Sequence, residues 1–290
     1  MNINKIKYIT IKQAIMWGYY KLKTSNIANS KNEAILLIAY TINSSYLNII
    51  TKYQQILNKN QIIKFINIIK RRSKNEPFAY ITEHKEFMGF NFFVNKSVLI
   101  PRPDTETLVK YALKAMPNKT IKYRCLDVCT GSGCIAISLA LMRPNIVIDA
   151  IDNSKPALKV LKYNIKYFNL EHRIRSIHNN LLYSYIINKK LNLIIANPPY
   201  LTQKEYNSLT PNIKNYEPKQ ALVNNKYDPL LVHKILIRDS YAYLLNKGIL
   251  ILEFGYNQKN KLIKIHRGKF KKPKFFTDYS RIPRVCIFQK

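Results

Sequence analysis

Residues 122–152 read "KYRCLDVCTGSGCIAISLALMRPNIVIDAID". A short apolar run at 122–128 leads into a loop with two glycines, and an apolar helix pattern at 133–142 leads into a second apolar run that ends at Asp152. A strand, a helix and a second strand in this order are typical of a βαβ unit, in which the two strands are parallel. This stretch therefore predicts an α/β fold.

The same alternation continues to the end of the chain. Two further helices are predicted at 154–168 and 231–245, and four further strands at 174–180, 191–200, 248–255 and 284–289. Strands separated by helices favour a Rossmann-like parallel sheet with helices on both faces. In such a sheet, ligands bind beyond the carboxyl ends of the strands.

The N-terminal part of the chain has a different pattern. Apolar residues recur at helical spacing in "NQIIKFINIIKRR", at Ile62, Phe65, Ile66 and Ile69. Ser30 and Glu33 stand three residues apart before an apolar run, which predicts a capping box at the start of a helix. We therefore expect a small helical bundle over residues 1–75.

A connecting segment follows the predicted bundle. In "EFMGFNFFVNKSVLIPRPD", aromatic and β-branched runs are interrupted at 95–97, which favours a hairpin, and Pro101 and Pro103 then force an extended chain. The predicted organisation is an N-terminal helical domain (1–75), a hairpin-like linker (76–105) and a sheet domain (106–290).

Composition restricts the class of protein. Among 290 residues, 48 are Lys or Arg and 16 are Asp or Glu, which gives a formal net charge of +32. A basic chain favours nucleic acid as a partner, but biased base composition also explains an excess of Lys, Asn, Ile and Tyr that is spread along the whole chain. Nucleic-acid contact is therefore an alternative that the composition permits without requiring it.

Cysteine spacing and hydropathy indicate the compartment. The four cysteines show no Cys-x-x-Cys spacing, so neither a zinc site nor a disulfide framework is predicted. There is no run of 18 uncharged apolar residues, and the first ten residues lack the apolar segment of a signal peptide. We expect a reduced cytoplasmic protein.

Two predicted strand ends suit a nucleoside-bearing cofactor. In "DVCTGSG" (127–133), Gly131 and Gly133 allow a tight turn into a helix N-terminus, whose free N–H groups attract anions. Asp152 lies roughly 20 residues further on, where a carboxylate can accept hydrogen bonds from two ribose hydroxyls. A plain strand–helix turn and a helix cap at Asp152 are the alternatives. The loop is not G-x-G-x-x-G, which disfavours NAD and favours S-adenosylmethionine.

A third predicted strand ends in "NLIIANPPY" (192–200), where two prolines remove N–H donors and stiffen the backbone. The nitrogen of an amide or aromatic amine is a poor nucleophile because its lone pair is delocalised. The Asn197 side-chain oxygen and the Pro198 carbonyl could hold both hydrogens of such a nitrogen, and Tyr200 could stack on its planar group. With a sulfonium methyl donor, in-line positioning is most of what the protein must add, and neither a metal nor a Ser–His–acid triad is needed.

The sequence resembles the HemK/PrmC family of release-factor glutamine methyltransferases over nearly its whole length. The loop in "LDVCTGSGCIAISLA" resembles the family's cofactor loop, and "ANPPY" resembles its catalytic motif. Similar segments surround them, namely "EPFAYITEHKEFMGFNFFVNKSVLIPRPDTETLV", "YEPKQAL", "ILEFGYNQ" and "DYSRIPRV". Asn-Pro-Pro-Tyr is shared with many amino-methyltransferases, whereas "IPRPDTE" at 100–106 is much more discriminating.

The resemblance implies a class I S-adenosylmethionine-dependent methyltransferase fold. It also implies an activity, which is methylation of the glutamine side-chain nitrogen in the Gly-Gly-Gln motif of peptide chain release factors, with the N-terminal helical domain helping to contact the protein substrate. The residues that it implies are Cys129, Thr130, Gly131, Ser132 and Gly133 at the methionine end of the cofactor, Asp152 at the ribose, Asn180 and Leu181 near the adenine, Asn197 beside the cofactor, and Asn197, Pro198, Pro199 and Tyr200 around the glutamine amide.

Departures and alternatives remain. Cys129 stands where the family often has Gly, and Asn180 stands where Asp is usual. The competing hypotheses are a ribosomal-protein glutamine methyltransferase, an adenine-N6 methyltransferase acting on DNA or RNA, and a non-catalytic basic protein with a worn methyltransferase fold. A monomer without a bound metal is expected.

Overall fold

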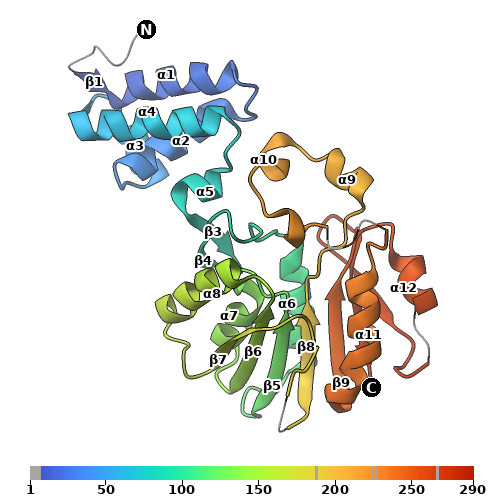
Figure 1. The fold of residues 1–290 in the computed structure, drawn as a ribbon. Helices are drawn as coiled ribbons and strands as arrows, with labels where there is room; N and C mark the ends of the chain where they lie inside the picture. The colour runs from blue at the N-terminus through green and yellow to red at the C-terminus, as the bar shows by residue number, and fades with distance from the viewer. Residues whose placement is uncertain (1–7, 187–188, 224, 226, 266–267) are drawn as a thin grey trace. The chain divides into compact units, whose positions relative to one another are not determined.

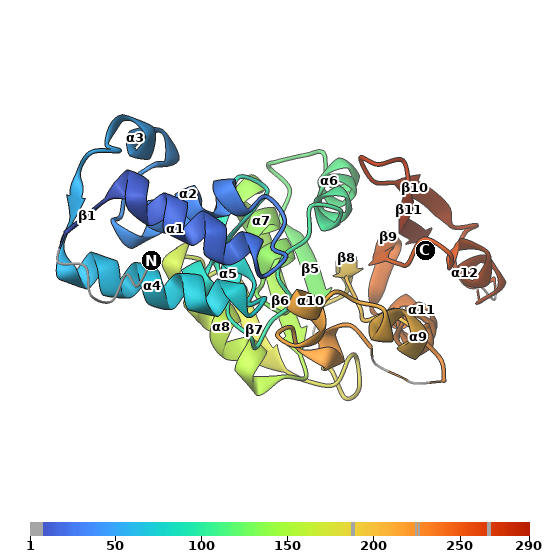
Figure 2. The ribbon, with the colours of Figure 1, turned by 90° about the horizontal axis from the view of Figure 1, so that it is seen from above.

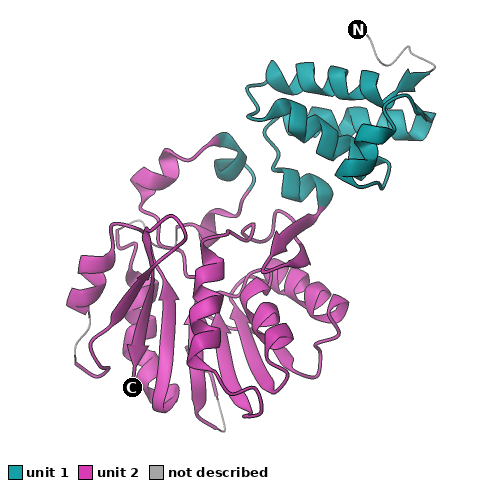
Figure 3. Ribbon diagram, turned by 180° about the vertical axis from the view of Figure 1, so that it is seen from behind, with its two compact units in different colours: residues 1–82, 211–216 teal, residues 83–210, 217–290 magenta. Residues whose placement is uncertain are grey.

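The computed structural model describes residues 8–290 apart from 187–188, 224, 226 and 266–267. Contacts divide the chain into two compact units, which Figure 3 shows in teal and magenta. Unit 1 comprises the described residues up to Thr82 together with Pro211–Tyr216, and unit 2 comprises Glu83–Thr210 and Glu217–Lys290. The first boundary therefore falls after residue 82, whereas the sequence predicted boundaries after residues 75 and 105.

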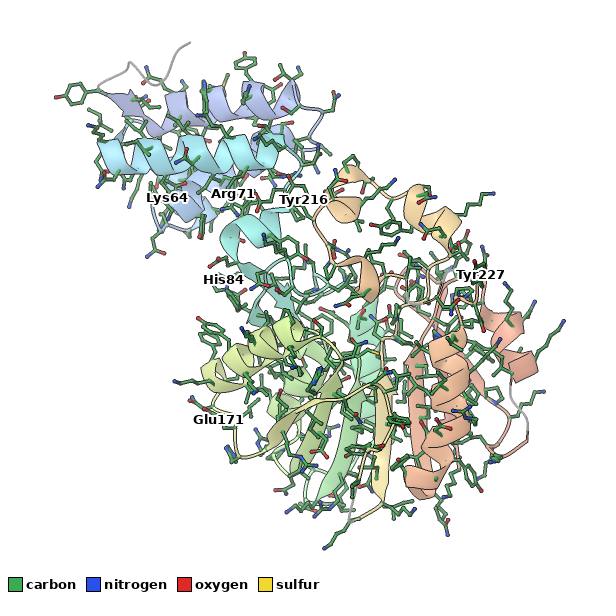
Figure 4. All side chains as sticks on the ribbon, in the orientation of Figure 1. Lys64, Arg71, His84, Glu171, Tyr216 and Tyr227 are labelled. Atoms are coloured by element: carbon green, nitrogen blue, oxygen red, sulfur yellow. The ribbon has the colours of Figure 1, made fainter. Side chains whose placement is uncertain are left out.

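Unit 1 is a helical bundle with one small strand pair. Its helices are α1 (Ile11–Lys23), α2 (Ser30–Thr41), α3 (Tyr46–Thr51), α4 (Lys59–Ser73), α5 (Phe78–Thr82) and α10 (Pro211–Lys214). Strands β1 (Ile9–Thr10) and β2 (Ile56–Leu57) pair antiparallel. The Tyr216 hydroxyl, just after α10, donates a hydrogen bond to the Lys74 carbonyl at 2.8 Å, which ties the 211–216 segment to this unit. Figure 4 labels Tyr216, and also Lys64 and Arg71 on α4.

The predicted apolar stripe of α4 forms part of the bundle core. Ile62, Phe65, Ile66 and Ile69 are all buried. Helix α1 packs closely at Gly18, because a Cβ there would lie 3.0 Å from Phe65 and 3.1 Å from Ile69. Burial of this stripe against α1 and α2 stabilises the bundle more than helix propensity does.

The predicted capping box at Ser30 is wrong. Helix α2 follows Asn29, which has a left-handed backbone (φ 51°), and no side chain caps it. Ser30 instead donates to the Ile27 carbonyl. The Glu33 carboxylate accepts two hydrogen bonds from the Arg72 guanidinium of α4, at 2.5 and 3.0 Å. The bidentate ion pair holds the acid more strongly than a cap would, and it joins α2 to α4.

Unit 2 begins with a hairpin whose turn differs from the prediction. Strands β3 (His84–Phe87) and β4 (Phe90–Phe93) pair antiparallel around Met88 and Gly89, and not around residues 95–97. Met88 and Gly89 both have positive φ, 54° and 80°. A two-residue hairpin turn whose twist matches the strands requires such backbones, and a glycine supplies one at low cost.

A seven-stranded sheet forms the centre of unit 2 (Figure 1). Its strands are β5 (Tyr123–Val128), β6 (Ile146–Asp152), β7 (Ile174–His178), β8 (Leu191–Ala196), β9 (Leu244–Glu253), β10 (Lys274–Thr277) and β11 (Pro283–Gln289). The spatial order is β10-β11-β9-β8-β5-β6-β7, in which β11 is antiparallel to both of its neighbours and the other pairs are parallel. The strand order reverses between β5 and β8, which is where a parallel sheet of this kind binds its ligand.

Helices cover both faces of this sheet. Apolar residues of α6 (Thr105–Ala115), α7 (Cys134–Met142) and α8 (Lys155–Tyr167) share one core with one face, and residues of α11 (Leu231–Tyr243) and α12 (Lys259–Ile265) share another core with the opposite face. Figure 2 shows α6 and α11 on opposite sides of the strands. The predicted α/β fold is confirmed.

Several short elements of unit 2 escaped prediction. The basic segment 258–277 contains α12 and β10, and the loop after β8 contains α9 (Gln203–Asn207) and a 3₁₀ turn at Lys219–Ala221. Strand β9 begins at Leu244, four residues before the predicted start. Prediction from sequence depends on apolar residues that recur at regular spacing. These elements are short and contain many polar and lysine residues, so the spacing cannot be recognised in them. No helix in the described ranges is long and apolar enough to cross a membrane.

Candidate active site

A cavity of about 290 Å³ lies at the carboxyl ends of β5, β6 and β8. Nine of the twelve predicted site residues line it, namely Cys129, Thr130, Gly131, Ser132, Asp152, Asn180, Leu181, Asn197 and Pro199. Gly133, Pro198 and Tyr200 are not among the described residues that line it. The glycine loop and the Asn-Pro-Pro-Tyr corner therefore face one cavity, although they are more than 60 residues apart in sequence.

The loop after β5 turns by means of three left-handed residues. Cys129, Gly131 and Gly133 have φ of 60°, 55° and 81°. A side chain at Cys129 is tolerated there, although glycine adopts this backbone at lower cost. Around Gly131 a Cβ would meet no atom within 4 Å, so its backbone borders open space.

Gly133 serves packing. It precedes α7, and a Cβ at this position would lie 2.3 Å from Leu161 Cδ1 on α8. The glycine thus lets α7 start directly against α8, and no cavity contact is needed to explain it.

Asp152, the last residue of β6, lines the cavity and forms a hydrogen bond with the loop that follows β5. Its Oδ2 accepts from the Gly131 N–H and its Oδ1 from the Ser154 N–H, both at 2.9 Å. Burial raises the pKa of this carboxyl, and the backbone hydrogen bonds oppose that rise. Each oxygen keeps a further lone pair for a ligand hydroxyl. Asn180, which is exposed, and Leu181 form another part of the wall.

A second carboxylate, Asp127, lies beneath the loop and was not predicted as a site residue. It is fully buried and accepts a hydrogen bond from the Thr130 hydroxyl at 2.6 Å. Burial raises the pKa of Asp127 to about 7, and its Oδ1 has no partner among the described residues. The signal for it was an acid inside the apolar strand "CLDV".

Side chains from other segments of unit 2 form hydrogen bonds with the Asn-Pro-Pro-Tyr corner. Asn197 Nδ2 donates to Thr105 Oγ1 at 3.1 Å, and the Tyr200 hydroxyl donates to Glu253 Oε1 at 3.3 Å. The Gln258 amide donates to the Tyr200 carbonyl at 2.7 Å. Burial raises the pKa of the Tyr200 phenol, so it remains a neutral donor.

The run "IPRPDTE" (100–106) contacts segments from all over unit 2. The Ile100 N–H (3.1 Å) and the Arg102 guanidinium (2.5 Å) both bind the buried Glu217 carboxylate, beside the 218–221 turn that forms part of the cavity wall. Asp104 pairs with Arg284 at 3.6 Å, and Glu106 accepts from the Met88 N–H at 2.9 Å. This short run therefore connects the hairpin, the corner, the 217–221 segment and the last strand.

No group of three or more His, Cys, Asp or Glu with metal-site geometry occurs in the part of the chain that the structure describes. The four cysteines are free. The polar groups that line this cavity include the Asp152 carboxylate and five carboxamide side chains, those of Asn153, Asn179, Asn180, Asn197 and Gln220.

Comparisons with known proteins identify two matching families and several relatives. Residues 13–82 match the family described as PrmC N-terminal domain, and residues 105–215 match the family described as methyltransferase small domain. The release factor glutamine methyltransferase of Buchnera aphidicola subsp. Schizaphis graminum is 38% identical and covers 100% of both chains. That of Clostridium acetobutylicum is 33% identical over 96% of this chain and 97% of the relative.

A solved structure shares the fold. The crystal structure of a methyltransferase from Pyrococcus furiosus matches with a TM-score of 0.51, at 16% identity, and covers 77% of this chain and 98% of that one. The match supports the predicted methyltransferase fold, and at this identity it carries no information about substrate.

Proposed function

This chain belongs to the family of release factor glutamine methyltransferases, and we propose that it methylates the side-chain amide nitrogen of the glutamine in the Gly-Gly-Gln motif of peptide chain release factors. The observation that carries the proposal is that Asn197 and Asp152 line one cavity. The group proposed to bind the amide and the group proposed to bind the ribose would then act on two substrates held in the same cavity.

The residues present fit S-adenosylmethionine. Asp152 offers free carboxylate lone pairs at the cavity wall, Gly131 leaves room beside the loop, and Ile151, Val232 and Ile235 supply apolar wall for a base. We propose that Cys129–Ser132 hold the methionine end, Asp152 the ribose, and Asn180 and Leu181 the adenine end. When bound, the cofactor supplies a methyl group on a positively charged sulfur.

The corner then prepares the nucleophile. We propose that the Asn197 side-chain oxygen and the Pro198 carbonyl accept the two hydrogens of the glutamine amide, which fixes the nitrogen and increases its electron density. Pro199 keeps the corner rigid, and Tyr200 borders the planar group. Positioning of this kind replaces bimolecular encounter and is a large source of rate enhancement.

Unit 1 has a separate proposed role. We propose that its helices help to contact the release factor, since residues 13–82 match a domain family named for this enzyme class. We further propose that the enzyme works as a monomer in the cytoplasm.

Labelling with substrates of different classes tests the proposed function. We expect methyl label from S-adenosylmethionine to enter a release factor, and no label to enter the same factor after Gln→Ala in its Gly-Gly-Gln motif. Purified ribosomes and DNA serve as parallel substrates. Label confined to a ribosomal protein, or to DNA or RNA, would replace the proposal by one of the alternatives named above.

Asp152→Asn tests the cofactor site. The amide would place its NH₂ against one of the two backbone N–H donors, so we expect the affinity for S-adenosylmethionine to fall by about 10- to 100-fold, as for loss of a hydrogen bond to a charged group. Isothermal titration calorimetry measures this. Asp149→Asn is the matched control, because Asp149 lies on the same strand but pairs with Arg175, which is 65% exposed. Equal affinities for both variants would remove Asp152 from the site.

A further inference from the structure

The two ends of the Asn197 amide have different surroundings. Nδ2 donates to Thr105 Oγ1 at 3.1 Å, whereas Oδ1 has no hydrogen-bond partner in the described part of the chain. The two ends are nearly the same in shape, so packing alone does not distinguish the two orientations of the group. A neighbour that accepts but does not donate is needed to select one of them.

The Thr105 hydroxyl acts purely as an acceptor toward Asn197 only if its hydrogen is donated to another group. The residue opens α6 and is 2% exposed, so water does not satisfy it. A hydroxyl that donated to Asn197 Oδ1 would stabilise the opposite orientation equally well. The direction of the contact therefore depends on what accepts from Thr105.

Glu253 is the acceptor beside it. The carboxyl lies at the end of β9, is 2% exposed, and its Oε2 has no hydrogen-bond partner among the described residues. The Thr105 hydroxyl lowers the pKa of Glu253, as expected of a donor, against the burial that raises that pKa to about 7. Tyr200 donates to the other oxygen, Oε1. Tyr200 of the corner therefore contacts this carboxyl directly, whereas Asn197 contacts Thr105, whose hydroxyl acts on the pKa of the same carboxyl.

The charge of Arg284 favours the ionised form of this acid. Arg284 lies near Glu253 and contacts Asp278 at 3.4 Å and Asp104 at 3.6 Å. An ionised carboxylate accepts hydrogen bonds and donates none. The buried Oε2 without a partner is available to take the Thr105 hydroxyl hydrogen, which would leave the Thr105 oxygen to accept from Asn197 Nδ2.

We propose that Thr105, directed by Glu253, is a positioning residue that holds the Asn197 amide with its oxygen turned toward the acceptor nitrogen of the substrate. The inference rests on the proposed function and deepens it. In the opposite orientation the Asn197 NH₂ would face the NH₂ of the substrate, and two donors would oppose each other. Thr105 thus sets which substrate groups the corner can hold, without itself touching the reacting atoms.

Thr105→Val and Thr105→Ser test this directly. Valine keeps the shape and removes the acceptor, so we expect kcat for release-factor methylation to fall by about 10- to 100-fold, the scale of a misplaced catalytic group. Serine keeps the hydroxyl, so we expect kcat within about threefold of wild type, a change too small to register as loss of a positioned group. The Kd of S-adenosylmethionine, measured by calorimetry, should be unchanged in both. Thr107→Val is the matched control, because Thr107 lies in the same helical turn and is 6% exposed.

The outcomes separate the inference from the proposed function. If wild-type protein transfers no methyl group to a release factor, the proposed function fails. If wild type is active and Thr105→Val keeps its kcat, or loses kcat no more than Thr107→Val does, the inference is overturned and the function stands. Parallel loss of cofactor binding in Thr105→Val would also overturn it, because the residue would then act on the cofactor and not through Asn197.

Discussion

Asn197→Ala is expected to reduce methyl transfer to a release factor by about 10³-fold, which is the scale for removing one preorganised hydrogen-bonding group from an active site. Of the two acceptors proposed for the glutamine amide, only the side-chain oxygen can be deleted by a single substitution, since the Pro198 carbonyl belongs to the backbone. Binding of S-adenosylmethionine should remain within a factor of about three, because Asp152 and the glycine loop are untouched. Single-turnover labelling measures the first quantity, and calorimetry measures the second.

Asn192→Ala provides the control for Asn197. Asn192 lies on β8, the strand that ends just before Asn197, its Oδ1 accepts from the Arg124 N–H at 2.8 Å, and it is not among the residues that line the cavity. Its loss should lower stability and leave the rate of transfer per folded molecule unchanged. Comparable loss of transfer and of cofactor binding in Asn197→Ala would show that the role assigned to Asn197 is wrong.

Gly133→Ala should lower the stability of unit 2 more than Gly89→Ala, which adds a side chain on a similar backbone without a clash. The added Cβ would lie 2.3 Å from Leu161 Cδ1, on a backbone with φ of 81°. Left-handed strain costs about 1–2 kcal/mol for alanine, and overpacking a core costs about 1–3 kcal/mol more. We therefore expect the melting temperature to fall by about 10 °C, measured by differential scanning calorimetry.

Gly89→Ala is the control that shows how much of the loss in Gly133→Ala comes from backbone strain and how much from the clash with Leu161. Gly89 has φ of 80°, nearly the value at Gly133, but a Cβ there would meet no atom within 4 Å. We expect its melting temperature to fall by only about 2–6 °C. Similar losses for both variants would mean that backbone strain alone matters and that α7 and α8 do not pack as described.

The sequence predicted the sheet well because its strands and helices are long and strongly periodic. The turn from β5 into α7, the position of Asp152 and the corner at Asn197 follow from apolar runs that end in glycine, acid or proline, and the structure places them beside one cavity. Short elements such as β10 carry too few apolar residues to be detected. The capping box at Ser30 failed because Glu33 had a distant partner, Arg72, which local reasoning does not consider.

The supporting residues of the site were harder to predict. Thr105, Glu217 and Glu253 act through partners about 50 to 120 positions away, and no local pattern specifies such contacts. One signal was present, because Asp127 and Glu253 are acids within apolar strands, where an unpaired charge is costly. The resemblance in "IPRPDTE" identified the right segment, but only the structure shows which partners its residues hold.

The strand order also has a consequence for biosynthesis. Strand β8 is central, and β9, which covers its open edge, is made about 50 residues later. A nascent chain that has not yet released residues 244–253 leaves a row of backbone groups on an apolar strand unpaired, a hazard for aggregation. Glu253 is the last residue of β9 and Arg284 is made later still, so the Asn-Pro-Pro-Tyr corner lacks these supporting residues until well after its own synthesis.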